Sequence, residues 1–322
     1  MINLLSYPLK IAKGIYSKFD SASSNYGRDW NRISIKDYTN DQIYNALLNN
    51  DPVMIARLGS TELTCMVNYI GVKNPGKYKS LKGYISQKTP PWWWNKSGIQ
   101  QMQNWSGFFP ATIVNIDKFC EMMIADLSKV DILGSWLKQE VFFNKELSGS
   151  KKVVLEDLEP FFASTPWTYA LKDKKVLVIH PFAEQIESQY LMRDKLFENN
   201  LLPHFELLTI KAVQSIAGEA TQYDDWFQAL DSMKKKIDEV DFDICILGCG
   251  AYGFPLAAYV KDIGKKAIHL GGVTQLLFGI KGARWEKYLV YPYENLYNKY
   301  WVRPSDNNKP KNASLVEGAC YW

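Results

Sequence analysis

The sequence predicts an α/β fold with a mostly parallel, Rossmann-like sheet that carries helices on both faces. From residue 174 onward, four apolar segments of strand length alternate with four helix-like segments. These apolar segments are continuous, which is typical of parallel strands that are buried on both faces. The chain has 322 residues, of which 47% are hydrophobic and 22% charged, enough to bury the core of one such domain.

The first half of the chain is expected to supply three strands and three helices. The spacing of apolar residues predicts the first helix, which Asp51-Pro52 ends. Ser60 is expected to cap the second helix, with Glu62 in its first turn. In chain order the expected elements are helix 40–50, strand 53–59, helix 60–70, helix 116–128, strand 130–136 and strand 152–157.

The second half of the chain alternates regularly between strands and helices. The expected elements are strand 174–182, helix 183–200, strand 205–212, helix 223–240, strand 242–250, helix 251–264, strand 265–272 and helix 273–282. Parallel α/β sheets bind their ligands beyond the carboxyl ends of the strands. The segments to consider for a site are therefore 57–62, 180–184, 211–214, 248–253 and 271–275.

Two regions of the domain organisation stand apart from these repeats. We interpret residues 1–35 as an amphipathic segment and connector, and 36–322 as a single catalytic domain. The first segment mixes lysines with apolar residues, which fits a helix on the inner membrane face or one packed on the protein. An aromatic-rich, irregular insertion is expected near 71–110. Its Trp92–Trp94 fit sugar stacking, a membrane interface or a packed loop.

Composition narrows the location and the partners. The net charge of +4 and the pI of about 8.5 suit an anionic ligand or membrane surface, but are too weak to indicate nucleic acid. Five scattered cysteines, three histidines and no CxxC pair argue against a zinc site and for reduced thiols. We therefore expect a cytoplasmic protein, with association at the cytoplasmic membrane face as a further expectation. No apolar run approaches the length of a membrane span.

A glycine-rich turn after the strand at 242–250 suggests a phosphate site. Gly248, Gly250 and Gly253, with Tyr252 among them, have the GxGxxG spacing, and a helix follows. A dinucleotide site needs an acidic residue at the end of the next strand, where this chain has His269-Leu270-Gly271. The remaining interpretations are a phosphate-bearing ligand of another kind, or glycines that serve strand–helix packing.

The segment RLGSTE (57–62) combines charges with a turn. Arg57 can clamp a phosphate or carboxylate, and Gly59 permits a tight turn. Glu62 at a helix start can act as a base, bind a metal or hold a sugar hydroxyl. A capping group with a structural ion pair is the alternative.

Two later segments add candidate ligand contacts. His180 and Glu184 follow a strand, where the histidine can bind phosphate, move a proton or serve a structural hydrogen bond. Beyond the glycine pair at Gly272, Lys281 and Arg284 suit a diphosphate leaving group, or form a solvated basic surface. Gln275 follows the same glycine pair and completes the set of candidate ligand contacts.

The segment MIARLGSTEL (54–63), together with the late glycine turn, resembles the bacterial glycosyltransferases of the GT-D fold, which carry Arg-x-Gly-Asp-x-Glu. Arg57, Gly59 and Glu62 match this motif, whereas Ser60 occupies the aspartate position. The resemblance implies sugar transfer from a nucleotide diphosphate sugar to a glycan or lipid-linked acceptor in capsule or surface polysaccharide synthesis. It also implies Mn²⁺ or Mg²⁺, for which Glu62 is the matching ligand, although loss of one carboxylate favours a metal-independent site.

On this interpretation Glu62 and Arg57 are the catalytic residues. The nucleotide sugar would contact Gly59, Ser60, His180, Glu184, Gly248, Gly250, Tyr252, Gly253, Gly272, Gln275, Lys281 and Arg284. Two alternatives stay open: a Rossmann-type oxidoreductase or methyltransferase that uses the glycine turn, and a non-catalytic scaffold of polysaccharide assembly, which the Ser60 substitution favours.

Overall fold

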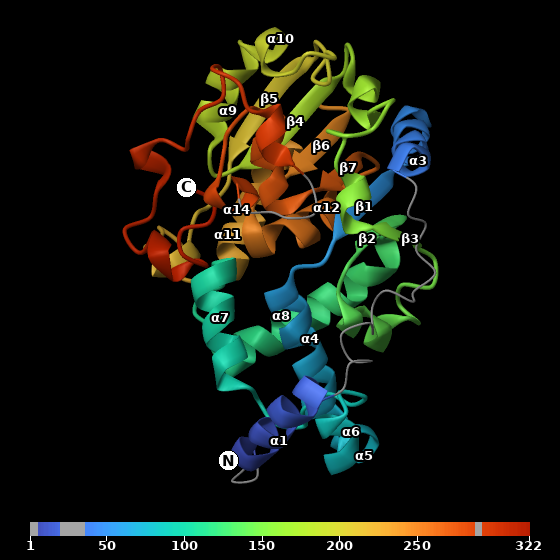
Figure 1. Cartoon of the computed structure of the whole chain (residues 1–322), viewed down its shortest axis with the longest axis vertical. Helices are drawn as coiled ribbons and strands as arrows, with labels where there is room; N and C mark the ends of the chain where they lie inside the picture. Colours follow the sequence, from blue (N-terminus) through green and yellow to red (C-terminus); the bar gives the residue numbers. More distant parts are fainter. Residues whose placement is uncertain (1–5, 20–35, 287–291) are drawn as a thin grey trace.

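A computed structural model describes residues 6–19, 36–286 and 292–322, so the predicted connector at 20–35 lies outside the described residues. The fold is α/β, built on one sheet of seven parallel strands in the order β3-β2-β1-β7-β6-β4-β5 (Figure 1). The strands are β1 Val53–Arg57, β2 Ile132–Ser135, β3 Lys151–Val154, β4 Lys175–His180, β5 Glu206–Lys211, β6 Ile244–Leu247 and β7 Lys266–His269.

The apolar strands feed two cores, one on each face of the sheet. In β4, Leu177 and Ile179 belong to one core and Val176 and Val178 to the other. All four side chains are fully buried, because successive residues of a strand point to opposite faces. The continuous apolar runs of the sequence therefore fill both cores at once, which confirms the predicted sheet with helices on both faces.

Thirteen α-helices of the described residues surround the sheet and extend from it. They are α1 Ser6–Phe19, α3 Lys36–Leu48, α4 Ser60–Lys73, α5 Pro75–Tyr78, α6 Leu81–Ile85, α7 Lys96–Ser106, α8 Ile113–Asp126, α9 Ala183–Tyr190, α10 Arg193–Leu196, α11 Trp226–Asp238, α12 Gly253–Asp262, α13 Thr274–Leu277 and α14 Ala283–Glu286. Short 3₁₀-helices connect several of them, including η2 Lys138–Phe143 and η6 Gly250–Tyr252.

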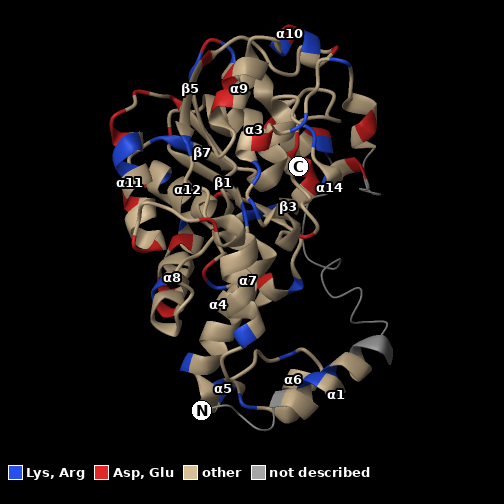
Figure 2. Ribbon diagram, turned by 90° about the vertical axis from the view of Figure 1, so that its left-hand side faces the viewer, with Lys and Arg blue, Asp and Glu red and all other residues tan. Residues whose placement is uncertain are grey.

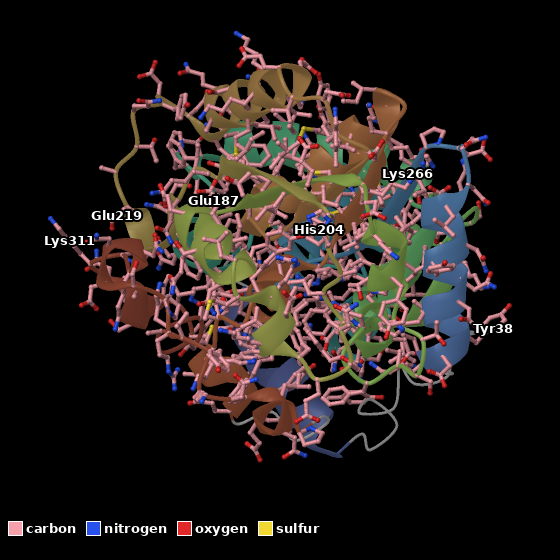
Figure 3. The ribbon with its side chains drawn as sticks, turned by 90° about the horizontal axis from the view of Figure 1, so that it is seen from above. Tyr38, Glu187, His204, Glu219, Lys266 and Lys311 are labelled. Atoms are coloured by element: carbon pink, nitrogen blue, oxygen red, sulfur yellow. The ribbon has the colours of Figure 1, made fainter. Side chains whose placement is uncertain are left out.

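The carboxyl ends of the central strands form a topological switch point. The neighbouring strands β1 and β7 lead to α4 and α13, which pack in opposite cores. Loops that diverge to opposite faces leave a crevice between them, where α/β sheets bind ligands. Figure 3 views the molecule from above and labels His204 and Lys266, which precede β5 and open β7 at the amino ends of the strands. The carboxyl ends lie at the other end of the strands, toward α4 and α7 (Figure 1).

Several predicted boundaries are wrong. The predicted helix 183–200 is two short helices, α9 and α10, and the predicted helix 273–282 ends at Leu277, after which Gly279 has a left-handed φ of +65°. Gly59 rather than Ser60 is the N-cap of α4, so no side-chain hydrogen bond caps the start of this helix. The segment 71–110 is not irregular as predicted, because it contains α5, α6 and α7.

The first helix and the tryptophan cluster meet at one end of the molecule. Helix α1 packs on α6, where Lys13 Nζ lies 5.1 Å from the centroid of the Tyr84 ring. Trp93 is buried against the same tyrosine, with ring centroids 4.9 Å apart. The neighbouring Trp92 and Trp94 are half-buried. Within the described segments, no helix has the length and apolar character to cross a bilayer.

Candidate functional site

A cavity of about 450 Å³ lies at the carboxyl ends of β1, β4, β6 and β7. The residues after these strands line it, together with the C-terminal residues Tyr321 and Trp322. Eleven of the fourteen predicted site residues line this cavity, namely Arg57, Gly59, Ser60, Glu62, His180, Gly248, Gly250, Tyr252, Gly272, Gln275 and Arg284. Most of the site residues that were predicted from the carboxyl ends of the strands (the strand-end rule) therefore lie in one cavity.

Arg57 and Glu62 place opposite charges at one wall of the cavity. Glu62 is buried in the first turn of α4, where the helix dipole stabilises a carboxylate. A Cβ on Gly59 would lie 1.8 Å from Glu62 Oε2, so the carboxylate folds back over this glycine. Burial lowers the pKa of Arg57, and the charge of Glu62 opposes that shift. Gly59 thus leaves the space that the Glu62 carboxylate occupies beside Arg57.

A turn after β2 supports Arg57 from the side. The Arg57 guanidinium carbon lies 5.1 Å from the Trp136 ring centroid, and Trp136 Nε1 donates to the Leu58 carbonyl at 3.0 Å. The buried carboxylate of Glu140 accepts hydrogen bonds from the Ser135 hydroxyl and the Trp136 amide at 2.5 and 3.1 Å. A carboxylate at the start of η2 therefore fixes the indole on which the guanidinium lies.

The glycine turn serves packing at two of its three glycines. A Cβ on Gly248 would lie 2.7 Å from Gly271 O, and a Cβ on Gly253 would lie 2.4 Å from His269 Nε2. The Gly248 amide already donates to the Ile179 carbonyl. Gly250 has a left-handed φ of +57°. Among the hydrogen bonds of the described residues, none uses the amides of Cys249 and Gly250, which line the cavity, as donors.

Two buried histidines flank this turn in their neutral form. Burial lowers the pKa of His180 to about 3, and burial with the nearby Arg57 charge lowers that of His269 to about 3. Nδ1 of His180 accepts the Phe182 amide at 3.0 Å, so the neutral ring carries its proton on Nε2. His180 therefore offers the cavity a neutral N–H donor rather than a positive charge for phosphate.

The C-terminal residues form another part of the cavity wall. The Arg284 guanidinium carbon lies 4.7 Å from the Tyr321 ring centroid, and its Nη2 pairs with Glu317. A Cβ on Gly272 would lie 2.4 Å from the same tyrosine ring, so the glycine makes room for it. The Gln275 amide donates to the Tyr321 carbonyl at 3.2 Å. Gly272 and Gln275 thus seat the tail that carries part of the cavity wall.

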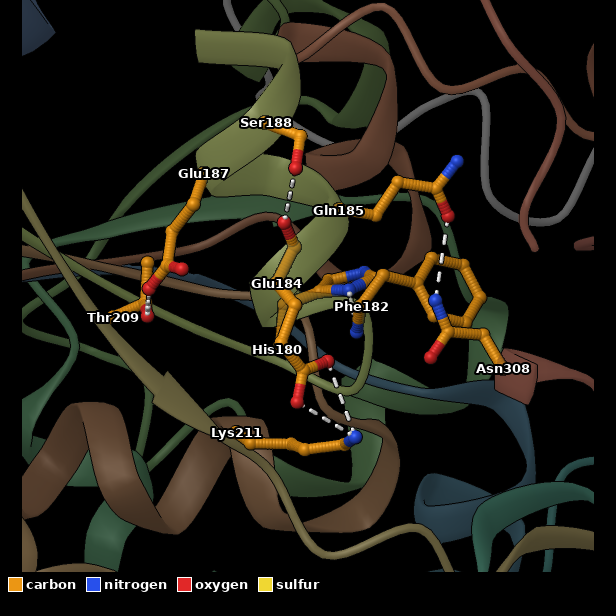
Figure 4. A network of polar contacts seen from close by, with 9 residues as sticks. All are labelled: His180, Phe182, Glu184, Gln185, Glu187, Ser188, Thr209, Lys211 and Asn308. Atoms are coloured by element: carbon orange, nitrogen blue, oxygen red, sulfur yellow. Dashed lines mark hydrogen bonds and ion pairs between the residues drawn. The ribbon is translucent and has the colours of Figure 1, made fainter. Parts of the chain in front are cut away.

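Three predicted site residues, Glu184, Gly253 and Lys281, lie outside the described residues that line the cavity. Glu184 is exposed on α9 and pairs with Lys211 of β5 at 2.9 Å (Figure 4), which lowers the pKa of Glu184. Lys281 Nζ lies 5.4 Å from the Tyr297 ring centroid. Tyr252 lines the cavity, but its ring stacks on Trp226 and its hydroxyl lies 3.2 Å from that of Ser215.

Sequence reasoning missed a buried carboxylic acid in the cavity wall. Glu159 lines the cavity, and burial raises its pKa to about 7, although a hydrogen bond from Tyr293 at 2.5 Å opposes the shift. A group with such a pKa exchanges protons near neutral pH. Glu159 and Trp136 follow β3 and β2, so the strand-end rule applied to these two strands would have found them.

The aromatic walls were also unforeseen. Trp92–Trp94 do not belong to the described lining of the cavity, which instead contains Trp105, Trp136, Trp285 and Trp322. Trp105 and Trp322 come from segments more than 200 residues apart, and no local pattern links them. Only the fold brings these indoles together.

The resemblance implies Mn²⁺ or Mg²⁺, with Glu62 as a ligand. Across residues 6–19, 36–286 and 292–322, no three His, Cys, Asp or Glu side chains gather closely enough to hold a metal ion. Hard cations prefer several oxygen ligands, and Ser60 offers a neutral hydroxyl where the family has a carboxylate. The described residues therefore do not fit a cation held by the protein alone.

Neither a protein-family model, nor a curated protein, nor a solved structure matches the chain. The likeness to the GT-D glycosyltransferases therefore stays a prediction from the sequence. The geometry of the cavity carries the functional proposal.

Proposed function

We propose that the protein is a glycosyltransferase that moves a sugar from a nucleotide diphosphate sugar to a glycan or lipid-linked acceptor. The observation that carries this proposal is the joint placement of two guanidiniums, a buried carboxylate and several indoles in one cavity of about 450 Å³. Each of these groups suits one part of such a donor. In a cell that makes surface polysaccharide, we place the enzyme on the cytoplasmic side of the membrane.

The two guanidiniums suit the diphosphate of the donor. Arg57 and Arg284 both line the cavity, close enough that the charge of Arg284 contributes to lowering the pKa of Arg57. Arginine donates several N–H groups in a planar fork, so Arg284 keeps donors beyond its Nη2 contact with Glu317. The amides of Cys249 and Gly250 and the neutral His180 add donors without further charge.

Glu62 suits the role of general base. In the proposed reaction the acceptor oxygen forms a bond to the anomeric carbon, and the bond from that carbon to the phosphate oxygen breaks. Glu62 takes the acceptor proton, and the leaving diphosphate takes the electron pair. Arg57 and Arg284 stabilise the negative charge on the departing diphosphate, where preorganised donors contribute most to rate.

The indoles suit the flat and apolar faces of the donor. Trp105, Trp136 and Trp322 line the cavity from three different segments. Indole faces stack on nucleobases and on the C–H faces of sugars. A dinucleotide is a poorer fit, because the strand end after the glycine turn offers His269 rather than an acidic residue for the ribose.

A ligand panel tests this proposal through thermal unfolding. UDP- and GDP-sugars are added to the protein with and without Mn²⁺, beside NAD(P) and S-adenosylmethionine. At ligand concentrations well above Kd, the matching nucleotide sugar should raise Tm by about 5 °C. Stabilisation by NAD(P) or S-adenosylmethionine, with no response to any nucleotide sugar, would overturn the proposal in favour of the Rossmann-type alternatives.

A further inference from the structure

The described segments at one end of the molecule carry lysines and no acidic residues. The tip consists of α1, α5, α6 and the segment 86–96, and the sequence has no Asp or Glu in 1–19 or in 63–116. Figure 2 shows lysines and no acidic residue on the described parts of α1, α5 and α6. Its exposed lysines are Lys10, Lys77, Lys79, Lys82, Lys88 and Lys96. The positive charge of the tip is therefore not neutralised within these segments.

Helix α1 adds an exposed apolar stripe to this basic tip. Tyr7, Ile11 and Ile15 are spaced four residues apart and are 74%, 52% and 55% exposed. Residues at this spacing lie on one face of a helix. Leu81 of α6, the helix on which α1 packs, is also 54% exposed. Lys10 Nζ donates to Asn95 Oδ1 at 3.1 Å, which ties α1 to the rest of the tip.

The tip lies at a fixed distance from the cavity. Helix α4 begins beside the cavity at Ser60 and ends next to α5 at Lys73 (Figure 1). Its 14 residues span roughly 21 Å at the usual helical rise. A surface bound to the tip would therefore lie about one helix length from the cavity.

We propose that this tip docks the protein on an anionic lipid bilayer. Lysines attract acidic headgroups, and an apolar helix face inserts at the boundary between headgroups and acyl chains. A second copy of the chain is a poorer occupant, because a symmetric interface would set lysines against lysines. Nucleic acid would match the charge but would leave the exposed Tyr7, Ile11 and Ile15 without a partner. This inference does not depend on the proposed function.

Vesicle sedimentation tests the docking surface. The full chain is mixed with vesicles of phosphatidylglycerol and phosphatidylcholine, or of phosphatidylcholine alone. We expect binding to the anionic vesicles, weak binding to the neutral ones, and a loss of binding as salt rises. Equal binding to both kinds of vesicle, or none to either, would overturn the proposal.

Matched variants separate the tip from the general charge of the protein. K77Q/K79Q/K82Q should weaken binding to anionic vesicles at least about tenfold, whereas K172Q/K235Q/K236Q, which removes the same charge elsewhere, should leave it near normal. The apolar contribution is tested in the same way: I15E should weaken binding, and L191E, at another exposed position, should not.

Three further results would contradict the docking proposal. The first is vesicle binding by the tip variants that equals that of the wild type. Another is a wild-type dimer that I15E dissociates. The third is a tip that binds duplex DNA in preference to vesicles. Because all the substituted side chains are exposed, a folded variant is expected in each case, and thermal unfolding checks this.

Discussion

At the scale of single residues, Gly59 offers a way to move Glu62 without removing it. Its φ of −73° is ordinary for alanine, but a Cβ there would displace the Glu62 carboxylate. We expect Gly59→Ala to lower the rate of sugar transfer about 100-fold, because catalysis depends on the position of the base. The free energy of unfolding should change by less than about 1 kcal/mol.

A matched control is Gly149→Ala, since a Cβ at that exposed glycine meets nothing within 4 Å. Rates and thermal unfolding are measured for both variants. Full activity of Gly59→Ala would show that the position of the Glu62 carboxylate does not matter for transfer.

Glu159 gives a pH-dependent prediction. Its pKa rises from 4.5 to about 7 on folding, so between these values the folded state holds a proton that the unfolded state has lost. The stability of the wild type should therefore fall as pH rises through this window, by up to about 3 kcal/mol. Glu159→Gln should be more stable than the wild type at pH values above about 7. Near the lower end of this pH window, the two proteins should have similar stability.

Denaturant unfolding at several pH values measures this difference, with the exposed Glu198→Gln as control. A stability difference between Glu159→Gln and the wild type that stays constant across the window would contradict the raised pKa.

At the scale of elements, the turn from β2 into η2 is a support for the cavity wall. Glu140 accepts from the Ser135 hydroxyl and from the amides of Trp136 and Leu137. Glutamine at this position replaces one acceptor oxygen with an NH₂ group. That group would face another hydrogen-bond donor, and such a mismatch costs about 1–3 kcal/mol. We expect Glu140→Gln to lower Tm and also to weaken nucleotide-sugar binding, because Trp136 contacts Arg57.

Calorimetric titration and thermal unfolding of Glu140→Gln measure both effects. Loss of stability with unchanged affinity would mean that the turn supports the core and not the ligand site.

Elements with a strong local pattern were predictable, and those set by distant contacts were not. The apolar runs at β4, β6 and β7 are visible in the sequence, because parallel strands are buried on both faces. The end of α9 at Tyr190 was missed, since that tyrosine donates to the Phe205 carbonyl at 2.8 Å across the fold. Helix α7 was missed because its segment was interpreted as irregular.

The candidate site also contains residues that a local sequence pattern predicted and residues that only distant contacts bring in. Arg57, Glu62 and the glycine turn were predictable because they lie at or shortly after the carboxyl ends of β1 and β6. The interpretation of the glycines needed the structure, which assigns Gly248 and Gly253 to close packing. The C-terminal wall at Tyr321 and Trp322 carries no sequence signal, since only the tertiary fold brings it to the cavity that the start of α4 also lines.

At the scale of the whole molecule, α4 joins the cavity, which its first turn lines, to the basic tip, which lies at one end of the long axis (Figure 1). An enzyme docked by the tip would hold its cavity roughly one helix length above the lipid surface. That arrangement suits an acceptor that is itself anchored to lipid. The two proposals are nevertheless tested independently, because vesicle binding requires no substrate.

The most direct measurement of the central proposal follows release of nucleoside diphosphate from a nucleotide sugar by the wild type and by Glu62→Gln, beside donor binding by both. We predict turnover by the wild type, and donor binding by Glu62→Gln within about tenfold of normal with turnover lowered by about 1,000-fold or more. Near-normal turnover by Glu62→Gln, or a wild type that binds no nucleotide sugar, would contradict the assignment.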